Sequence, residues 1–229
     1  MRSMIFDAGP IISLATNNLL WILDPLKKKF KGEFYITDAV KRELVDVPLE
    51  TKKFKFEAIQ VQKLIEDGVI KIYDDSTIKE KATGLLEFAN HVFRAFDNYM
   101  KIIHYAEMSV LAAAMSLKSD AVVIDEKTTR LLMEEPNVML NIMKKNMHSS
   151  IGLNESNLKQ FRNSTKDIHT IRSVELVTVA YEQKLLDGFV TDIPDARKNL
   201  LESVLWGVKL NGCAVTREEL ERIIKLEPK

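Results

Sequence analysis

Short apolar runs alternate with longer stretches of helical spacing over the first 140 residues of the chain. The short runs are rich in β-branched and aromatic residues, which favour strands. They predict strands at residues 3–7, 34–36, 69–73 and 121–124, with 138–140 as a weaker fifth. Strands that alternate with helices predict an α/β fold, in which a mainly parallel sheet carries helices on both faces.

The stretches between these runs place apolar residues at the spacing of an amphipathic helix. Thr37 or Asp38 is suited to cap the start of one helix, and Gly68 is suited to end another. The predicted helices span residues 10–26, with a break at 16–18, then 37–46, 51–67 and 77–117, the last of which divides into two helices near 97–101.

The pattern changes after Pro136. Residues 144–166 are rich in Asn, Ser and Lys, which indicates a polar insertion. Helical spacing then returns, and Thr216 with Glu219 fits a capping box at the start of the last helix. The chain is therefore predicted to comprise an α/β domain at 1–140, a polar insertion or linker at 141–167 and a helical extension at 168–229. The extension is predicted to contain helices at 171–186, 194–210 and 216–226.

Composition narrows the classes of function. The 229 residues include 33 Lys and Arg against 33 Asp and Glu, so the net charge is zero and a strongly basic nucleic-acid binder is excluded. Any site for a polyanion must be local. The one cysteine, Cys213, excludes an internal disulfide framework and a Cys-rich zinc site. We find no signal peptide and no apolar run of membrane-spanning length, so we expect a cytoplasmic protein with no membrane partner.

Acidic side chains recur where the predicted strands end. Asp7 ends the first strand, and Asp125 ends the fourth and is followed by Glu126. Glu43 lies in the helix after the second strand, and Glu107 opens an apolar, Ala-rich helix. The carboxyl ends of parallel strands are where ligands collect. Carboxylates gathered there would raise one another's pKa values, so a cation is needed at neutral pH, and oxygen ligands favour Mg²⁺ or Mn²⁺.

Taken in order, four blocks of sequence resemble the PIN-domain nucleases. The blocks are residues 6–14, 36–44, 106–112 and 122–130, which contain Asp7, Glu43, Glu107 and Asp125 in turn. The resemblance implies a parallel sheet flanked by helices and metal-dependent cleavage of single-stranded or structured RNA, often by the toxin of a toxin–antitoxin pair. It also implies that these four acids hold one or two Mg²⁺ or Mn²⁺ ions, with Glu126 as a candidate further ligand. The helical extension is similar, more faintly, to that of some prokaryotic PIN proteins.

Each of these residues also has a structural interpretation. Asp7 and Asp125 are both placed to cap helices, and Glu43 and Glu126 fit solvated helix positions. Arg130 is placed to contact a phosphate of bound nucleic acid, or to pair with Glu134 one helical turn later.

The function also has alternatives at this stage. Gly9 stands where the resembling family often has a hydroxyl or amide side chain, which motivates a PIN-like binding or scaffolding protein that has lost catalysis. A phosphatase with Asp7 as nucleophile normally has a second Asp at the position that Gly9 occupies. The apolar stripes of the C-terminal helices are suited to pack on the α/β domain, to form a homodimer or to receive an antitoxin helix.

Overall fold

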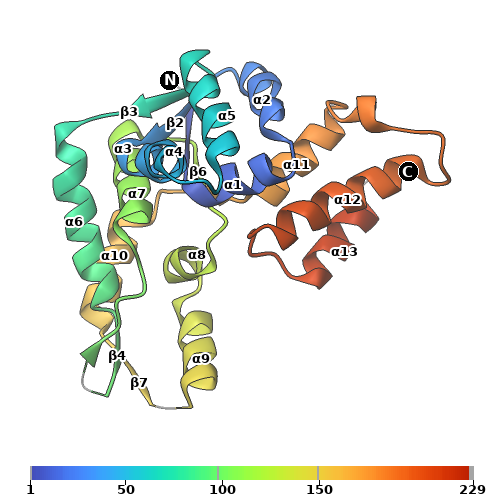
Figure 1. The fold of residues 1–229 in the computed structure, drawn as a ribbon. Helices are drawn as coiled ribbons and strands as arrows, with labels where there is room; N and C mark the ends of the chain where they lie inside the picture. The colour runs from blue at the N-terminus through green and yellow to red at the C-terminus, as the bar shows by residue number, and fades with distance from the viewer. Residues whose placement is uncertain (1, 97, 149, 227–229) are drawn as a thin grey trace.

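The computed structural model describes residues 2–96, 98–148 and 150–226 (Figure 1). A five-stranded sheet with the strand order β3-β2-β1-β6-β8 forms its centre, and all neighbouring strands are parallel. The predicted α/β class is confirmed. The strands are β1 (Ser3–Phe6), β2 (Glu33–Thr37), β3 (Ile70–Tyr73), β6 (Ala121–Val123) and β8 (Thr170–Ile171).

Strand β1 lies in the middle of this sheet, hydrogen-bonded to β2 on one side and β6 on the other. Met4 is in register with Phe34 and with Ala121. The pairing continues one residue past the strand, where the backbone N–H of Asp7 donates to the carbonyl oxygen of Val123 over 2.9 Å. The end of β1 is therefore fixed on the carboxyl edge of the sheet with neighbours on both sides.

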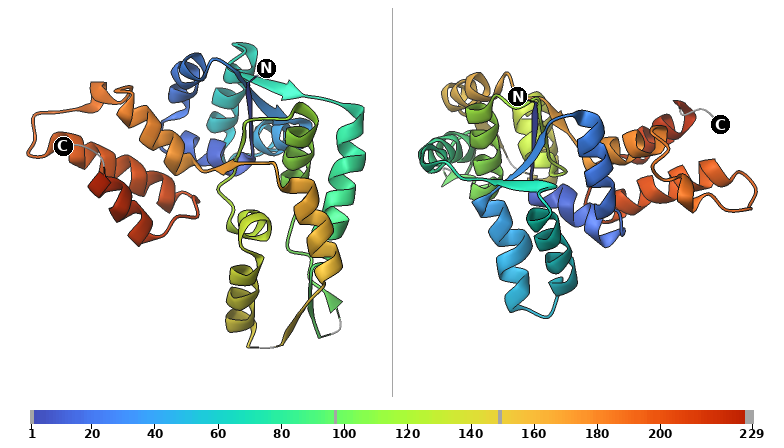
Figure 2. Two further views of the ribbon diagram at one scale, coloured as in Figure 1. Left: turned by 180° about the vertical axis from the view of Figure 1, so that it is seen from behind. Right: turned by 90° about the horizontal axis from the view of Figure 1, so that it is seen from above.

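Helices cover both faces of the sheet, as predicted. Figures 1 and 2 show α6, α7 and α10 on one side, with α1, α2 and α5 on the other. The helices of this part are α1 (Ala8–Thr16), η1 (Leu20–Ile22), α2 (Leu23–Phe30), α3 (Asp38–Lys41), the π-helical turn η2 (Arg42–Asp46), α4 (Val47–Glu50), α5 (Lys55–Glu66), α6 (Ser76–Asn90), α7 (Tyr105–Leu117), α8 (Lys127–Glu134) and α9 (Pro136–Met147).

Local signals placed several of these boundaries correctly. Helix α1 ends at the predicted break, and the Thr37 hydroxyl accepts a hydrogen bond from the backbone N–H of Val40 at the start of α3. Gly68 follows α5 with φ +70°, a conformation that glycine adopts without strain. The fifth predicted strand, 138–140, is wrong because these residues lie inside α9. Pro136 begins that helix, which suits the fixed φ of proline.

A second, small sheet separates α6 from α7, where we predicted only a break between two helices. Strand β4 (Phe93–Ala95) pairs antiparallel with β5 (Asn98–Tyr99) and with β7 (Ile151–Leu153). Strand β7 and the following helix, α10 (Glu155–Thr165), arise from the segment predicted as a polar insertion. In the described residues this segment is thus built into the fold beside α6 (Figure 1).

The C-terminal part of the chain contributes β8 to the main sheet and then forms helices. These are α11 (Ser173–Glu182), η3 (Asp187–Phe189), α12 (Ala196–Leu210) and α13 (Arg217–Leu226). The predicted capping box is present, since the Thr216 hydroxyl accepts from the N–H of Glu219 over 3.1 Å and the Glu219 carboxylate accepts from the N–H of Thr216 over 2.7 Å. Helices α11 and α12 contact each other and α1.

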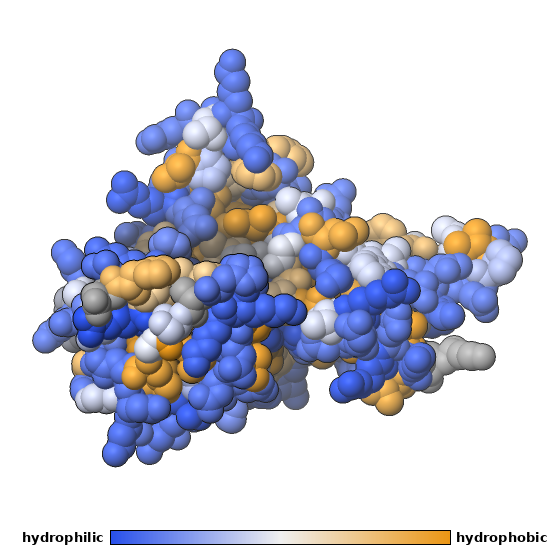
Figure 3. All heavy atoms as spheres, turned by 90° about the horizontal axis from the view of Figure 1, so that it is seen from below, coloured by the Kyte–Doolittle hydropathy of each residue, from blue (hydrophilic) through white to orange (hydrophobic). Residues whose placement is uncertain are grey.

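Polar and charged side chains cover much of the face seen in Figure 3. On the face seen in Figure 3, short apolar patches are separated by hydrophilic side chains. None of the helices in the described parts of the chain combines the length and the apolar character needed to cross a membrane.

Candidate active site

Asp7 is the buried acid at the centre of the carboxyl edge. It follows β1 directly, has extended backbone angles and precedes α1, and its side chain is 6% exposed. The pKa of its carboxyl is raised from 3.8 to about 7, first by burial and then by the negative charge of Glu107. The backbone N–H of Ala8 opposes this rise, and the charge of Glu43 adds to it. The negative charges of two other carboxylates, Glu107 and Glu43, therefore act on Asp7.

Glu107 lies in the first turn of α7, on the face of the molecule that Asp7 reaches. One of its carboxylate oxygens, Oε2, is buried and has no hydrogen-bond partner among the described residues. A buried carboxylate oxygen without a partner is unfavourable, and such a group calls for an ion or water that satisfies it. Glu107 is thus the side chain in this cluster that most needs a ligand.

Glu43 approaches the same cluster from the π-helical turn η2. Its pKa is raised by partial burial and by the charge of Glu107, while His104, which precedes α7, acts in the opposite direction. Glu43 also lines a small apolar cavity together with Ile12 of α1 and Leu44. Glu107 therefore interacts with both other acids, and the structure brings together Asp7, Glu43 and Glu107 from three separate elements.

The donor set limits how a metal ion would be held. Within residues 2–96, 98–148 and 150–226, no three or more His, Cys, Asp or Glu side chains are arranged closely enough to form a complete site. Mg²⁺ is usually bound by only one or two carboxylates, with waters and substrate phosphates as its other ligands. Asp7 and the unpartnered Oε2 of Glu107 fit this mode of binding, with Glu43 beside them.

Asp125 has a different environment, although it follows the adjacent strand. It is 1% exposed, and its Oδ1 accepts from the backbone N–H of Ser173 over 2.7 Å. Its Oδ2 accepts from the hydroxyl groups of Ser173 over 2.7 Å and Ser13 over 2.9 Å. Both oxygens are therefore occupied by donors of the chain itself, and the carboxylate is held at the N-terminus of α11.

Gly9 lies between Asp7 and Asp125. A Cβ atom at this position would lie 3.4 Å from the Cβ of Asp125 and 3.7 Å from Oδ2 of Asp7. These are ordinary contact distances, so the backbone has room for a small side chain here.

Glu126 serves as the N-cap of α8. Its two carboxylate oxygens accept from the backbone N–H groups of Thr128 over 2.7 Å and Thr129 over 2.6 Å. The cap that we had considered for Asp125 is thus supplied by the next residue. Arg130 lies in the same helix, and its Nε is buried without a hydrogen-bond partner in the described part of the chain. Glu134, its predicted partner, accepts a hydrogen bond from the Thr170 hydroxyl.

No sequence pattern indicates the partners of Asp125. Ser13, Ser173 and Cys213 come from three distant segments, and Cys213 is buried next to the aspartate. Burial and the negative charge of Asp125 raise the pKa of the Cys213 thiol to about 12, so it stays protonated. No local pattern marks such residues, because their contacts depend on how the C-terminal part docks against α1.

Comparison with known proteins agrees with this arrangement. A family model described as a PIN domain matches residues 3–141. No curated protein and no solved structure matches the chain. The matched region covers more than half of the chain and contains the parallel strands β1, β2, β3 and β6. It also contains all four acids, with Asp7 and Asp125 after strands, Glu43 in η2 and Glu107 in α7. The chain therefore belongs to the PIN-domain family.

Proposed function

We propose that this protein is a metal-dependent endoribonuclease that hydrolyses phosphodiester bonds of single-stranded or structured RNA. PIN domains are generally nucleases, and they typically use divalent metals. The observation that carries the proposal is the pairing of Asp7, whose pKa is raised to about 7, with the buried and unpartnered Oε2 of Glu107. A divalent cation would stabilise the buried carboxyl group of Asp7 and the buried oxygen of Glu107, and these two residues would hold Mg²⁺ or Mn²⁺.

The residues of the chain have distinct roles in this proposal. A divalent cation in such a site supplies an activated water and stabilises the charge that develops on the phosphate oxygens. Asp7 and Glu107 orient the site from the sheet edge and from α7. Glu43 adds negative charge at its rim. Arg130 of α8, whose Nε has no hydrogen-bond partner among the described residues, is a candidate phosphate contact. Asp125 holds α1 and α11 together through its hydrogen bonds to Ser13 and Ser173.

Cleavage of a fluorescent single-stranded RNA in the presence of Mn²⁺ tests the proposal. We expect EDTA to abolish cleavage, and Asp7→Asn and Glu107→Gln to lower it at least 100-fold while the far-UV circular dichroism spectrum is unchanged. Asp192→Asn, which alters an exposed carboxylate in the C-terminal part, is the matched control and should cleave normally. Cleavage by Asp7→Asn at the wild-type rate would contradict the assignment.

A PIN-like binding or scaffolding protein without catalysis is the second candidate. The environment of Asp125 favours it, because both carboxylate oxygens of this acid already accept hydrogen bonds from the chain itself. Calorimetric titration with Mn²⁺ separates the two candidates. Heat of binding that disappears in Asp7→Asn supports the nuclease, whereas the absence of binding at millimolar Mn²⁺ supports the scaffold.

A toxin role follows as a finer part of the proposal. If the protein is the toxin of a toxin–antitoxin pair, its induced expression should arrest bacterial growth, and expression of Asp7→Asn should not. Size-exclusion chromatography with light scattering tests the predicted homodimer of the C-terminal helices in the same preparations.

A further inference from the structure

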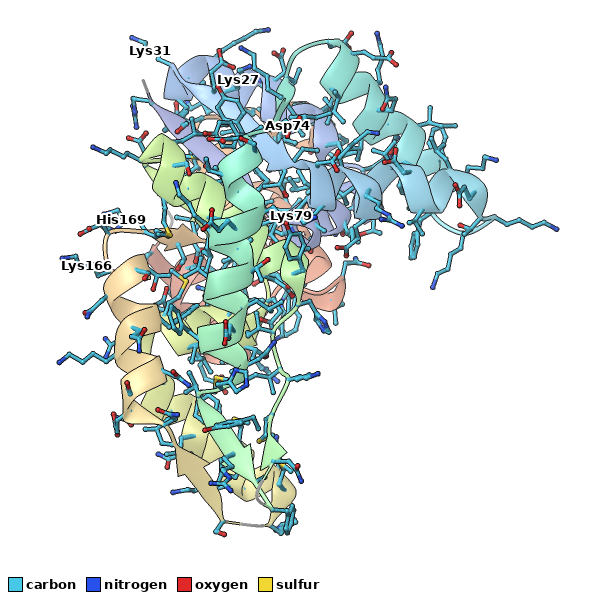
Figure 4. The ribbon with its side chains drawn as sticks, turned by 90° about the vertical axis from the view of Figure 1, so that its left-hand side faces the viewer. Lys27, Lys31, Asp74, Lys79, Lys166 and His169 are labelled. Atoms are coloured by element: carbon cyan, nitrogen blue, oxygen red, sulfur yellow. The ribbon has the colours of Figure 1, made fainter. Side chains whose placement is uncertain are left out.

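A cavity of about 510 Å³, lined by both polar and apolar groups, opens at the ends of β2 and β3. Its walls come from the start of α3, the start of α6 and the first turn of α7. Figure 4 shows two of its residues on one side of the molecule, with Asp74 where β3 leads into α6 and Lys79 on α6 itself. We refer to this cavity, lined among others by Asp38, Arg42, Asp74, Lys79, Tyr105 and Ser109, as the edge pocket.

The edge pocket and the acid cluster are distinct but adjacent. Asp7, Glu43 and Glu107 do not line the pocket. Two of its lining residues, Arg42 and Ala106, directly precede Glu43 and Glu107 in the sequence. Consecutive Cα atoms are about 3.8 Å apart, so the wall of the cavity begins one residue away from these two acids. An RNA strand with one phosphate at the acids would therefore bring a neighbouring nucleotide to this cavity.

The floor of the pocket is internally satisfied. Ser109 donates its hydroxyl hydrogen to the carbonyl oxygen of Ala106 over 2.6 Å, so the Thr37 hydroxyl is the donor in the 2.7 Å hydrogen bond between these two side chains. Thr37 in turn accepts from the N–H of Val40. These groups have no hydrogen left to offer a ligand, and they contribute shape to the pocket.

The rim of the pocket carries the groups that remain available. Tyr105 is 38% exposed, and in the described residues its hydroxyl has no hydrogen-bond partner. Arg42 and Lys79 form no ion pair there, and the carboxylates of Asp38 and Asp74 accept no hydrogen bond. Asp75 differs from them, because it accepts from the N–H of Thr77 and from the Tyr73 hydroxyl.

From this arrangement we propose that the edge pocket binds a nucleobase that flanks the phosphodiester held at Asp7 and Glu107. The inference rests on the proposed function and adds a specificity site to it. The ring of Tyr105 stacks on the base, as aromatic side chains do in proteins that bind single strands. Arg42 and Lys79 neutralise the adjoining phosphate, which compensates for the low overall charge of the protein.

The carboxylates give the pocket a preference among bases. Asp38 and Asp74 accept hydrogen bonds from an exocyclic amino group, as acidic side chains do with cytosine N4. Adenine, cytosine and guanine carry such a group, and uracil does not. The pocket therefore favours the amino-bearing bases over uracil.

Titration with mononucleotides tests this inference without a cleavable bond. We expect 5′-AMP to bind the full-length protein more tightly than 5′-UMP, and inorganic phosphate to bind more weakly than either. Tyr105→Ala should weaken AMP binding about 5- to 150-fold, the equivalent of one stacked base at about 1–3 kcal/mol. Asp38→Asn combined with Asp74→Asn should remove the preference of AMP over UMP.

Matched controls keep the outcome interpretable. Tyr99→Ala replaces a tyrosine of similar exposure, 44%, on β5 outside the pocket, and it should leave AMP binding unchanged. If Tyr105→Ala unfolds, Tyr105→Leu retains the apolar bulk without the aromatic face. AMP binding that is unaffected by the Tyr105 variants, or no binding at millimolar nucleotide, overturns the inference. AMP binding at the pocket in a protein that does not cleave RNA would contradict the proposed nuclease alone.

Discussion

Ser173 binds both carboxylate oxygens of Asp125, with its backbone N–H 2.7 Å from Oδ1 and its hydroxyl 2.7 Å from Oδ2. The two residues are 48 positions apart, and Ser173 begins α11. An aspartate at the end of β6 thus fixes the N-terminus of a helix from the C-terminal part, where the partial positive charge of the helix dipole favours it. The C-terminal helices are in this way attached to the carboxyl edge that carries Asp7.

The first prediction concerns this attachment. Ser173→Ala removes a hydrogen bond to a buried charged group, so we expect the free energy of unfolding to fall by about 1.5–3 kcal/mol. The affinity for Mn²⁺ should change less than twofold, because in our proposal Asp7 and Glu107 hold the ion and Asp125 does not contact it. Urea unfolding and calorimetry of the same samples give both quantities.

Ser203→Ala is the control for this measurement. The Ser203 hydroxyl donates to the carbonyl oxygen of Leu200 on the exposed side of α12, so its loss should change the stability by less than about 0.5 kcal/mol. If Ser173→Ala leaves the stability unchanged but lowers the affinity for Mn²⁺ tenfold, Asp125 belongs to the metal site itself.

The second prediction concerns the dependence of stability on pH. The pKa of Asp7 is about 7 in the folded protein, against 3.8 for an unperturbed aspartate side chain. Burial and the charge of Glu107 disfavour its ionisation. The folded state therefore binds more protons than the unfolded state between these values. In metal-free buffer, the stability of the wild type should fall relative to Asp7→Asn as the pH rises from 4 to 7, by roughly 4 kcal/mol at most.

Urea unfolding at several pH values in EDTA measures this difference. Glu107→Gln should reduce the slope, since it removes the largest of the charges that raise the pKa of Asp7, and Glu43→Gln should reduce it less. Parallel curves for the wild type and Asp7→Asn would show that Asp7 ionises normally in the folded protein.

Most elements, and the positions of the four acids along them, were predictable from the sequence because their signals are local. Each signal is contained in a few consecutive residues. Examples are the strand that ends before Asp7, the helix cap at Thr37 and the helix stop at Gly68. Strand β8 was missed because it is two residues long and is defined by its pairing with β6. The hydrogen bonds of Asp125 were equally inaccessible, since Ser173 reaches it only through the docking of the C-terminal part.

The third prediction is that Mn²⁺ stabilises the fold. An ion that binds the folded state alone stabilises it by about 2.7 kcal/mol at a concentration 100 times its Kd. We expect millimolar Mn²⁺ to raise the Tm of the wild type at pH 8, where Asp7 is ionised. Asp7→Asn and Glu107→Gln should show little increase, whereas Glu126→Gln, which alters a capping acid, should respond like the wild type. An equal rise in Tm for all four proteins would indicate binding elsewhere.

The fourth prediction uses the space at Gly9. A side chain here would point between Asp125 and Oδ2 of Asp7 at ordinary contact distances, so Gly9→Ser should fold. Its hydroxyl is placed to donate a hydrogen bond to Asp7, which favours the ionised carboxylate and should lower the pKa of Asp7.

A more readily ionised Asp7 binds a cation more tightly. We therefore expect Gly9→Ser to increase the affinity for Mn²⁺ at pH 7 by about 2- to 10-fold, the equivalent of one hydrogen bond of about 0.5–1.5 kcal/mol. Gly9→Ala is the matched control, since it fills the same space without a donor. Calorimetric titration of the three proteins decides the question, and equal affinities for Gly9→Ser and Gly9→Ala would mean that the hydroxyl does not reach Asp7.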